Sequence, residues 1–245
     1  MYKKLRPAIA MIELIFAIAI MGIVLMSAPM LIQTATSAAY VAIQQESISE
    51  AASRVNMILS YSWDENNTDE SYPSTILTVT SGAPDLDKTL TMQRKGTPPI
   101  SYRSFADSNG SELNATTAAS FLLDPAEATP DDIDDFHNEV IHLRDISAIS
   151  GRHADIDYIE KTTDINITTH ISYSTDNTEE GDYQQSPITY NPFTALGGLP
   201  TDTSNIKMIE VTLRSATSVS ELQKTITLRA FSCNIGSYVL EEKDF

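Results

Sequence analysis

Cysteine is nearly absent from this sequence, because Cys233 is the single cysteine among 245 residues. One thiol excludes an intramolecular disulfide framework and a zinc site built from cysteines. The fold must therefore be held together by packing, and a chain of this length is long enough for one sizeable core. We expect Cys233 to act as a small, buried apolar residue.

Basic residues are also scarce, with 16 Lys and Arg against 33 Asp and Glu and a net charge of −17. A surface of this sign repels phosphate groups, so the composition argues against nucleic acid as a partner. The charges are unevenly placed. Lys3, Lys4 and Arg6 lie near the N-terminus, whereas residues 46–245 carry 13 basic and 32 acidic side chains. The acidity therefore belongs to the larger, C-terminal part of the chain.

Motifs that carry catalysis are missing from the sequence. It contains no G-x-S-x-G motif, no phosphate-binding glycine loop and no H-E-x-x-H pair. The four histidines form no compact ligand set, so we expect surface residues at His137, His142, His153 and His170, the last on the polar face of a strand. We do not expect an enzyme.

One long neutral run dominates the N-terminal part. No charged residue occurs between Glu13 and Glu46, and the 19 residues of Leu14–Ile32 are almost all apolar. A helix of that length covers ~28 Å at ~1.5 Å per residue, close to the ~30 Å hydrocarbon core of a bilayer. The basic N-terminus should stay in the cytoplasm, so we expect a single membrane span with the rest of the chain on the far side.

Two residues in this run are unusual for a plain membrane anchor. Glu13 is a carboxylate beside the apolar segment, and at a bilayer centre it would cost roughly 2.5–3.5 kcal/mol. Pro29 removes a backbone donor, so we expect the helix to weaken or bend there. On composition alone, Glu13 is either a functional group in the membrane or the end of an isolated anchor whose carboxylate reaches the headgroups.

The basic leader and the segment Ile9–Ile23 (I-A-M-I-E-L-I-F-A-I-A-I-M-G-I) resemble the N-terminal signal of type IV pilins and pseudopilins. Ala8 and Ile9 stand where the family usually has glycine and phenylalanine. The resemblance implies cleavage between Ala8 and Ile9 by a prepilin peptidase and N-methylation of Ile9. It also implies that Glu13 pairs with the Ile9 amine of a neighbouring subunit and so sets the register of subunits, and that Gly22 and Pro29 break the helix.

The domain organisation follows from these patterns. Residues 1–8 form a cytoplasmic leader, and residues 9–60 an N-terminal helix whose transmembrane part is 9–32. Apolar residues continue at helical spacing beyond the span, at Ile43, Ile48, Ala51, Val55 and Ile58. This stripe predicts that the second half of the helix packs against a head formed by residues 61–245.

The sequence of the head is typical of short strands separated by polar turns. Alternation predicts strands at residues 88–94, 164–173, 205–214 and 224–231, a final short strand at 237–240, and a hairpin connection at 215–221. On the second strand Ile165, Ile167, Ile171 and Tyr173 share one face, and on the third Ile209, Val211 and Leu213 do. The predicted fold class is α+β, with an antiparallel sheet that has one face on the long helix.

An acidic segment, Asp131–Asn138, and the closing paired strands are similar to those of minor pilins of the mannose-sensitive haemagglutinin type. Its carboxylates offer hard oxygen ligands for a calcium ion, although their spacing is not that of an EF-hand. We favour a solvated acidic loop or helix start over a metal site for these four residues: Asp131, Asp132, Asp134 and Asp135. No other cofactor is expected.

The function that the sequence predicts is a minor pilin or pseudopilin of a Gram-negative type IV pilus or type II secretion system. Its expected partners are other pilin subunits, the prepilin peptidase and the inner-membrane assembly platform. It would reside in the inner membrane with its head in the periplasm, and then in the pilus or pseudopilus. The alternative is a membrane-anchored periplasmic binding module that never polymerises, with the loop 176–204 and its aromatic residues Tyr183, Tyr190 and Phe193 as recognition surface.

Overall fold

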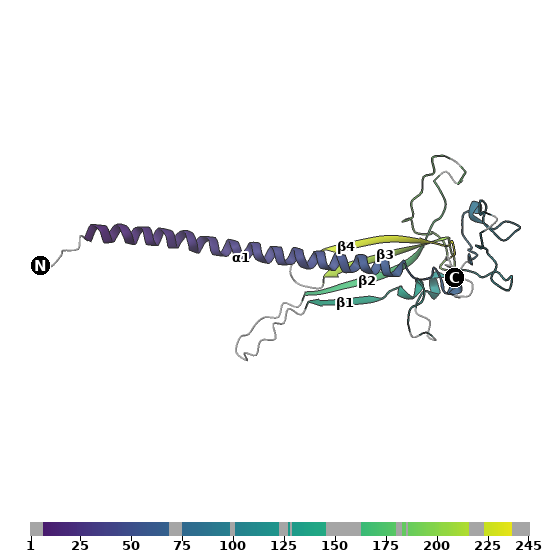
Figure 1. The fold of residues 1–245 in the computed structure, drawn as a ribbon, viewed down its shortest axis with the longest axis horizontal. Helices are drawn as coiled ribbons and strands as arrows, with labels where there is room; N and C mark the ends of the chain where they lie inside the picture. Colours follow the sequence, from purple (N-terminus) through teal and green to yellow (C-terminus); the bar gives the residue numbers. More distant parts are fainter. Residues whose placement is uncertain are drawn as a thin grey trace, which may run out of the picture. The chain divides into compact units, whose positions relative to one another are not determined.

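A computed structural model describes residues 7–68, 75–98, 101–122, 127, 129–145, 163–179, 183–184, 186–215 and 223–236. The chain divides into two compact units, Met1–Glu46 and Ser47–Phe245. The first unit is part of one long helix, and the second holds the end of that helix together with a β-sheet (Figure 1). The leader residues 1–6 lie outside the described residues.

The helix α1 spans Pro7–Ile58 and contains 52 residues. It is continuous through Gly22 and Pro29, so the helix break that the resemblance implied at these positions is not present. Proline fixes φ near the helical value but removes one donor and crowds the preceding turn. Membrane-spanning helices tolerate such residues because local adjustments satisfy the freed backbone group. A Cβ added at Gly22 would have no atom within 4 Å, so no close packing in this structure requires glycine there.

Four antiparallel strands form one sheet in the order β1-β2-β3-β4. Their bounds are Val140–Asp145 for β1, Thr163–Ser174 for β2, Ile206–Ser215 for β3 and Thr225–Cys233 for β4. Short 3₁₀ helices lie outside the sheet, at Glu65–Asn67 (η1), Pro84–Leu86 (η2), Ala118–Ser120 (η3) and Asp134–Phe136 (η4). The predicted α+β class, with a long N-terminal helix and a C-terminal antiparallel sheet, is confirmed.

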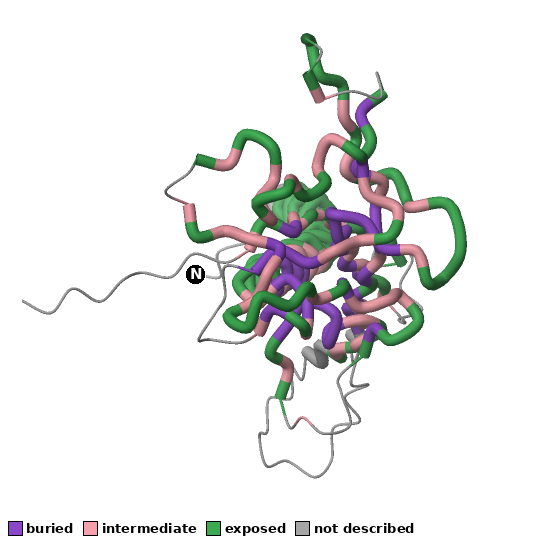
Figure 2. The backbone as a smooth tube through the Cα atoms, turned by 90° about the vertical axis from the view of Figure 1, so that its right-hand side faces the viewer, coloured by how far each residue is buried: buried purple, intermediate pink, exposed green. Residues whose placement is uncertain are grey.

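The core forms where the sheet residues alternate in burial. The inward positions of β2 are buried, as predicted, at Ile165, Ile167, Ile171 and Tyr173. On β3 the predicted Ile209, Val211 and Leu213 are all buried. The last turns of α1 add Ala51, Val55 and Ile58 to the same set of buried residues, which Figure 2 shows in purple.

Arg54 links the last turns of α1 to the start of β1. Its guanidinium forms an ion pair with Glu139 and lies over the ring of Phe136, 4.8 Å from the centroid. Burial lowers the pKa of Arg54, and the nearby Tyr61 and Glu50 oppose this shift. These contacts of Arg54 add to the burial of Ala51, Val55 and Ile58, which belong to the predicted apolar stripe.

The predicted strand at residues 88–94 is wrong. Lys88 and Arg94 form only an isolated antiparallel bridge, and Met92 has a positive φ of 60° where the chain turns back. The side chain of Leu90 is fully exposed, so the apolar alternation of this segment faces no core. The strand predicted at 237–240 and most of the hairpin connection lie outside the described residues, whereas β1 was not predicted at all.

Candidate functional site

The N-terminal half of α1 is the first candidate site. Its large apolar residues from Met11 to Ile32 are exposed, and α1 is the one helix among the described residues that is long and apolar enough to cross a membrane. Glu13 lies in the first turns, between Ile12 and Leu14, which are both more than half exposed. Ala8 and Ile9 belong to the first turn of α1, and their side chains are not among those described.

A buried lysine forms the second candidate site. Lys207 lies on β3 with its side chain fully buried, and its ammonium donates to Asp64 Oδ2 and to the Trp63 carbonyl oxygen, both at 2.8 Å. It also donates to Asp134 Oδ1. Three aromatic rings enclose the ammonium, with centroids at 4.3 Å for Trp63, 5.1 Å for Phe121 and 5.7 Å for Tyr173. We call Lys207 with Asp64, Asp132 and Asp134 the Lys207 centre.

Asp64 is held by more donors than the other carboxyl groups of the Lys207 centre. It is the N-cap residue of η1, and its Oδ1 accepts the backbone N–H of Asn66 at 3.2 Å. Thr116 donates its hydroxyl to Oδ1 and its backbone N–H to Oδ2, both at 2.9 Å. With the ammonium of Lys207, these donors leave both oxygens of Asp64 engaged.

Asp132 and Asp134 have far fewer partners. Oδ2 of each residue is buried without a hydrogen-bond partner among the described residues, while Oδ1 of Asp132 accepts the N–H of Asp135 at 3.1 Å. Burial raises the pKa of Asp134 to about 7, with the charge of Lys207 opposing the shift. Burial and the charge of Asp134 raise the pKa of Asp132 to about 8, so this carboxyl group keeps its proton at neutral pH.

The structure corrects the expectation of a solvated acidic loop. Asp132, Asp134 and Asp135 are buried, with exposed fractions of 1%, 3% and 9%. The segment is drawn inward because its apolar neighbours Ile133 and Phe136 belong to the core. Each of the three carboxyl groups hydrogen-bonds within the turn or to Lys207, and the four aspartates do not converge on one metal position.

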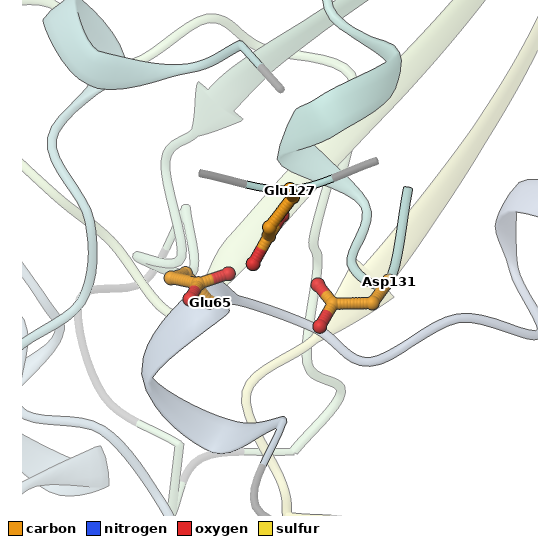
Figure 3. Close-up of side chains that lie close together, drawn as sticks. All are labelled: Glu65, Glu127 and Asp131. Atoms are coloured by element: carbon orange, nitrogen blue, oxygen red, sulfur yellow. The ribbon is translucent and has the colours of Figure 1, made fainter. Parts of the chain in front are cut away.

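Only Asp131 of the four remains exposed, and it meets two carboxylates from elsewhere. One oxygen from each of Glu65, Glu127 and Asp131 lies within 4.8 Å of the others, and Figure 3 shows the three carboxylates pointing toward one another. Carboxylate oxygens are the ligands that calcium prefers, but calcium takes 6–8 of them. Three carboxylates alone leave most of such a coordination sphere to water or to other groups.

The histidines are not all surface residues. His142 and His170 are exposed, as predicted, whereas His153 lies outside the described residues. His137 is half-buried: its Nδ1 accepts the backbone N–H of Ile171 at 3.1 Å, and its ring lies 4.8 Å from that of His170. Burial and the neighbouring His170 lower the pKa of His137. For His137 the expectation of a surface side chain is wrong, because its ring is half-buried and accepts a hydrogen bond from the backbone of β2.

The hydroxyl groups of both tyrosines in the loop 176–204 are bonded to the backbone where the loop begins. Tyr183 donates its hydroxyl to the carbonyl oxygen of Asp176, and Tyr190 donates to that of Thr175 at 3.1 Å. Phe193 is partly exposed and lies edge-on to the ring of Phe231 at 6.1 Å. A cavity of about 280 Å³ adjoins the loop, lined by residues 83–85, 177–178 and 183–184.

Cys233 closes β4 as a half-buried, free thiol. Burial raises its pKa, and the guanidinium of Arg94 opposes this shift. A thiol with a raised pKa carries little thiolate and is a poor nucleophile. Its position agrees with the predicted apolar role, although the residue is less buried than expected.

Comparisons with protein families, with curated proteins and with solved structures found no match to this chain. The functional conclusion therefore depends on the residues described above. No role was predicted for Lys207 from the sequence, and no buried site was predicted at Asp64. The signal for Lys207 was present, since it shares the parity of Ile209 and Val211 on β3 and so points to the buried face.

Proposed function

We propose that this protein is a minor pilin or pseudopilin, a structural subunit that joins a type IV pilus or a type II secretion pseudopilus of a Gram-negative bacterium. The observation that carries the proposal is the N-terminal half of α1. This half combines an unbroken, exposed apolar surface with one carboxylate, Glu13, and it belongs to the same helix that ends in the core of the head.

An exposed apolar helix of this length is stable only in lipid or against other apolar helices. The membrane provides the first environment, and lateral packing with neighbouring subunits provides the second. Glu13 then needs a cationic partner, because a carboxylate in a low-dielectric environment is costly when unpaired. Cleavage between Ala8 and Ile9 would create such a partner, the terminal amine of Ile9 on a neighbouring subunit.

The charge distribution supports the same assignment. The basic leader stays in the cytoplasm, the helix crosses the inner membrane once, and the acidic head lies in the periplasm before assembly. The partners are other pilin subunits, the prepilin peptidase and the inner-membrane assembly platform. An acidic head has no affinity of its own for nucleic acid, and the role is structural rather than enzymatic.

The replacement of Glu13 by valine tests this proposal. Glu13→Val removes the carboxylate and keeps an apolar helix, so the protein should still insert into the membrane but be lost from sheared filaments or from the assembled pseudopilus. Glu46→Val makes the same change at an exposed position of α1 outside the span and should leave assembly intact. Assembly of Glu13→Val at the level of the unchanged protein would refute the proposal.

The alternative function is a membrane-anchored binding module that does not polymerise. The hydroxyl groups of Tyr183 and Tyr190, which would serve a recognition surface, are both bonded to backbone carbonyl oxygens at the start of the loop. The ligand binding of such a module would also be unchanged by Glu13→Val. The contacts of the loop therefore favour the structural subunit over the binding module.

A further inference from the structure

We propose that Lys207 and Asp134 become joined by an amide bond between Nζ and Cγ, an internal covalent cross-link of the head. This inference is independent of the proposed function. It follows from the Lys207 centre, where an amine and a carboxyl group are held in direct contact beside a second carboxyl group.

The two reactants are held by different elements and shielded from water. Lys207 lies on β3 and Asp134 in η4, and their side chains are 0% and 4% exposed. The rings of Trp63, Phe121 and Tyr173 surround the ammonium. Fixed contact between two reacting groups raises their effective concentration by many orders of magnitude. Exclusion of water also protects the product from hydrolysis, because hydrolysis needs a water molecule at the same place.

Asp134 is the carboxyl group that the amine can attack. Its Oδ2 is buried with no hydrogen-bond partner among the described residues, and burial raises its pKa to about 7, so a large share of it is the neutral acid at neutral pH. A neutral carboxylic acid is a better electrophile than a carboxylate. Asp64 differs, since the donors of Thr116 and Asn66 engage its oxygens.

Asp64 is placed to move the protons of the reaction. Its Oδ2 accepts a hydrogen bond from Nζ at 2.8 Å, so it can take one proton from the ammonium and leave a neutral amine that attacks Cγ of Asp134. A second proton then passes from Nζ to the departing hydroxyl oxygen as the tetrahedral intermediate collapses, and Asp64 ends as the neutral acid. The Nζ–Cγ bond forms, one C–O bond of Asp134 breaks and one water molecule leaves. Nothing is oxidised or reduced, and no other reactant is needed.

The cross-link would tie η4 to β3 across 73 positions of the chain. A covalent tie of this kind prevents the two elements from separating when the chain is unfolded or pulled. It also replaces a buried charge with a neutral amide whose N–H can still donate to Asp64. The product therefore keeps the hydrogen bond and removes a costly buried ammonium.

Peptide mapping of the full chain, extracted from membranes in detergent, tests the proposal. Trypsin does not cleave after an acylated lysine, so we expect residues 104–144 joined to 162–214, with a mass lower than the sum of the two by one water. Recovery of the separate peptides 104–144, 162–207 and 208–214 in place of the joined pair would overturn the proposal. A link from Lys207 to peptide 55–88, which contains Asp64, would overturn the choice of Asp134.

Two variants test the role of Asp64. Asp64→Asn keeps the shape of the side chain but cannot take up the proton, so the linked peptide pair should be lost while the chain still shows a cooperative thermal transition. Asp131→Asn changes an exposed carboxylate outside the Lys207 centre and should leave the link complete. Full linkage in folded Asp64→Asn would overturn its role. If that variant does not fold, the peptide map of the unchanged protein still decides whether the bond exists.

Discussion

Asp132 illustrates how burial, together with neighbouring carboxylates, can set the charge of a residue. It is 1% exposed, one of its oxygens has no partner among the described residues, and Asp134 and Asp135 lie nearby. The pKa of Asp132 is raised to about 8, with burial as the main cause. The folded protein therefore binds a proton here over a pH range in which the unfolded chain, with an ordinary aspartate near pKa 3.9, does not.

This difference predicts that stability falls as pH rises. Between about pH 4 and pH 8 the folded state holds more protons than the unfolded state, so the free energy of unfolding decreases by at most ~1.4 kcal/mol per pH unit for each such carboxyl group. Trp63 is the only tryptophan and lies beside Lys207, so its fluorescence reports unfolding of this region. Denaturant midpoints should fall from pH 5 to pH 8.

Asp132→Asn provides the matching variant. An amide keeps the shape of the side chain but does not titrate, so the decline in midpoint with pH should become shallower. Asp107→Asn, at a loop carboxylate outside the Lys207 centre, should leave the decline unchanged. An equally steep decline in Asp132→Asn would show that other groups cause it. An Asp134 consumed by the proposed amide bond would leave Asp132 as the titrating group, so the direction stays the same.

At the scale of residues, a single pattern was enough to single out Glu13. It is a carboxylate beside a long apolar run, and its role stays a prediction. Lys207 was overlooked although its parity placed it inward, because lysine is normally exposed. Asp64 and Asp134 are separated from Lys207 by 143 and 73 positions, and only the folded backbone brings them together.

At the scale of elements, Arg54 provides a polar attachment of the end of α1 to the head. Arg54→Ala would remove the ion pair with Glu139 and the contact with the Phe136 ring. Since Arg54 is only 10% exposed, we expect a loss of about 1–3 kcal/mol of unfolding free energy. Lys95→Ala removes a more exposed pair with Asp85 and should cost about 0–1 kcal/mol. Equal losses of unfolding free energy in the two variants, measured by denaturant unfolding, would contradict the role of Arg54 in attaching α1 to the head.

The sheet makes a similar prediction for one position on the inner strand β3 and one on the edge strand β4. Ile209 on β3 is fully buried, so Ile209→Ala should cost about 2–5 kcal/mol by leaving a cavity. Leu228 on β4 is half-exposed, and Leu228→Ala should cost about 1 kcal/mol. Denaturant midpoints of both variants check the order. A larger loss for Leu228→Ala would mean that another surface covers β4 in solution.

Strand prediction worked where alternation coincided with burial. β2 and β3 were found because their apolar residues occupy every second position facing the core. Residues 88–94 show a similar alternation, but Leu90 faces solvent and the segment turns at Met92. β1 was missed because its pairing with β2 depends on a distant partner, and propensity alone does not reveal it.

At the scale of the whole molecule, two units with opposite surface character share one chain. The first unit presents apolar side chains to its surroundings, and the second has a conventional buried core. The apolar unit needs lipid or neighbouring helices, while the acidic unit needs water. Under the proposed function, cleavage between Ala8 and Ile9 would decide between a permanent anchor and a subunit that leaves the bilayer for a filament.

The mature N-terminus tests this account most directly. Mass spectrometry of the protein from cells with and without prepilin peptidase should identify the first residue and its modification. We predict a chain that begins at Ile9 with an N-methylated amine, and an uncut chain beginning at Met1 when the peptidase is absent. A native chain that begins at Met1, or one cut after Ala28 or later, would contradict the assignment as a pilin or pseudopilin.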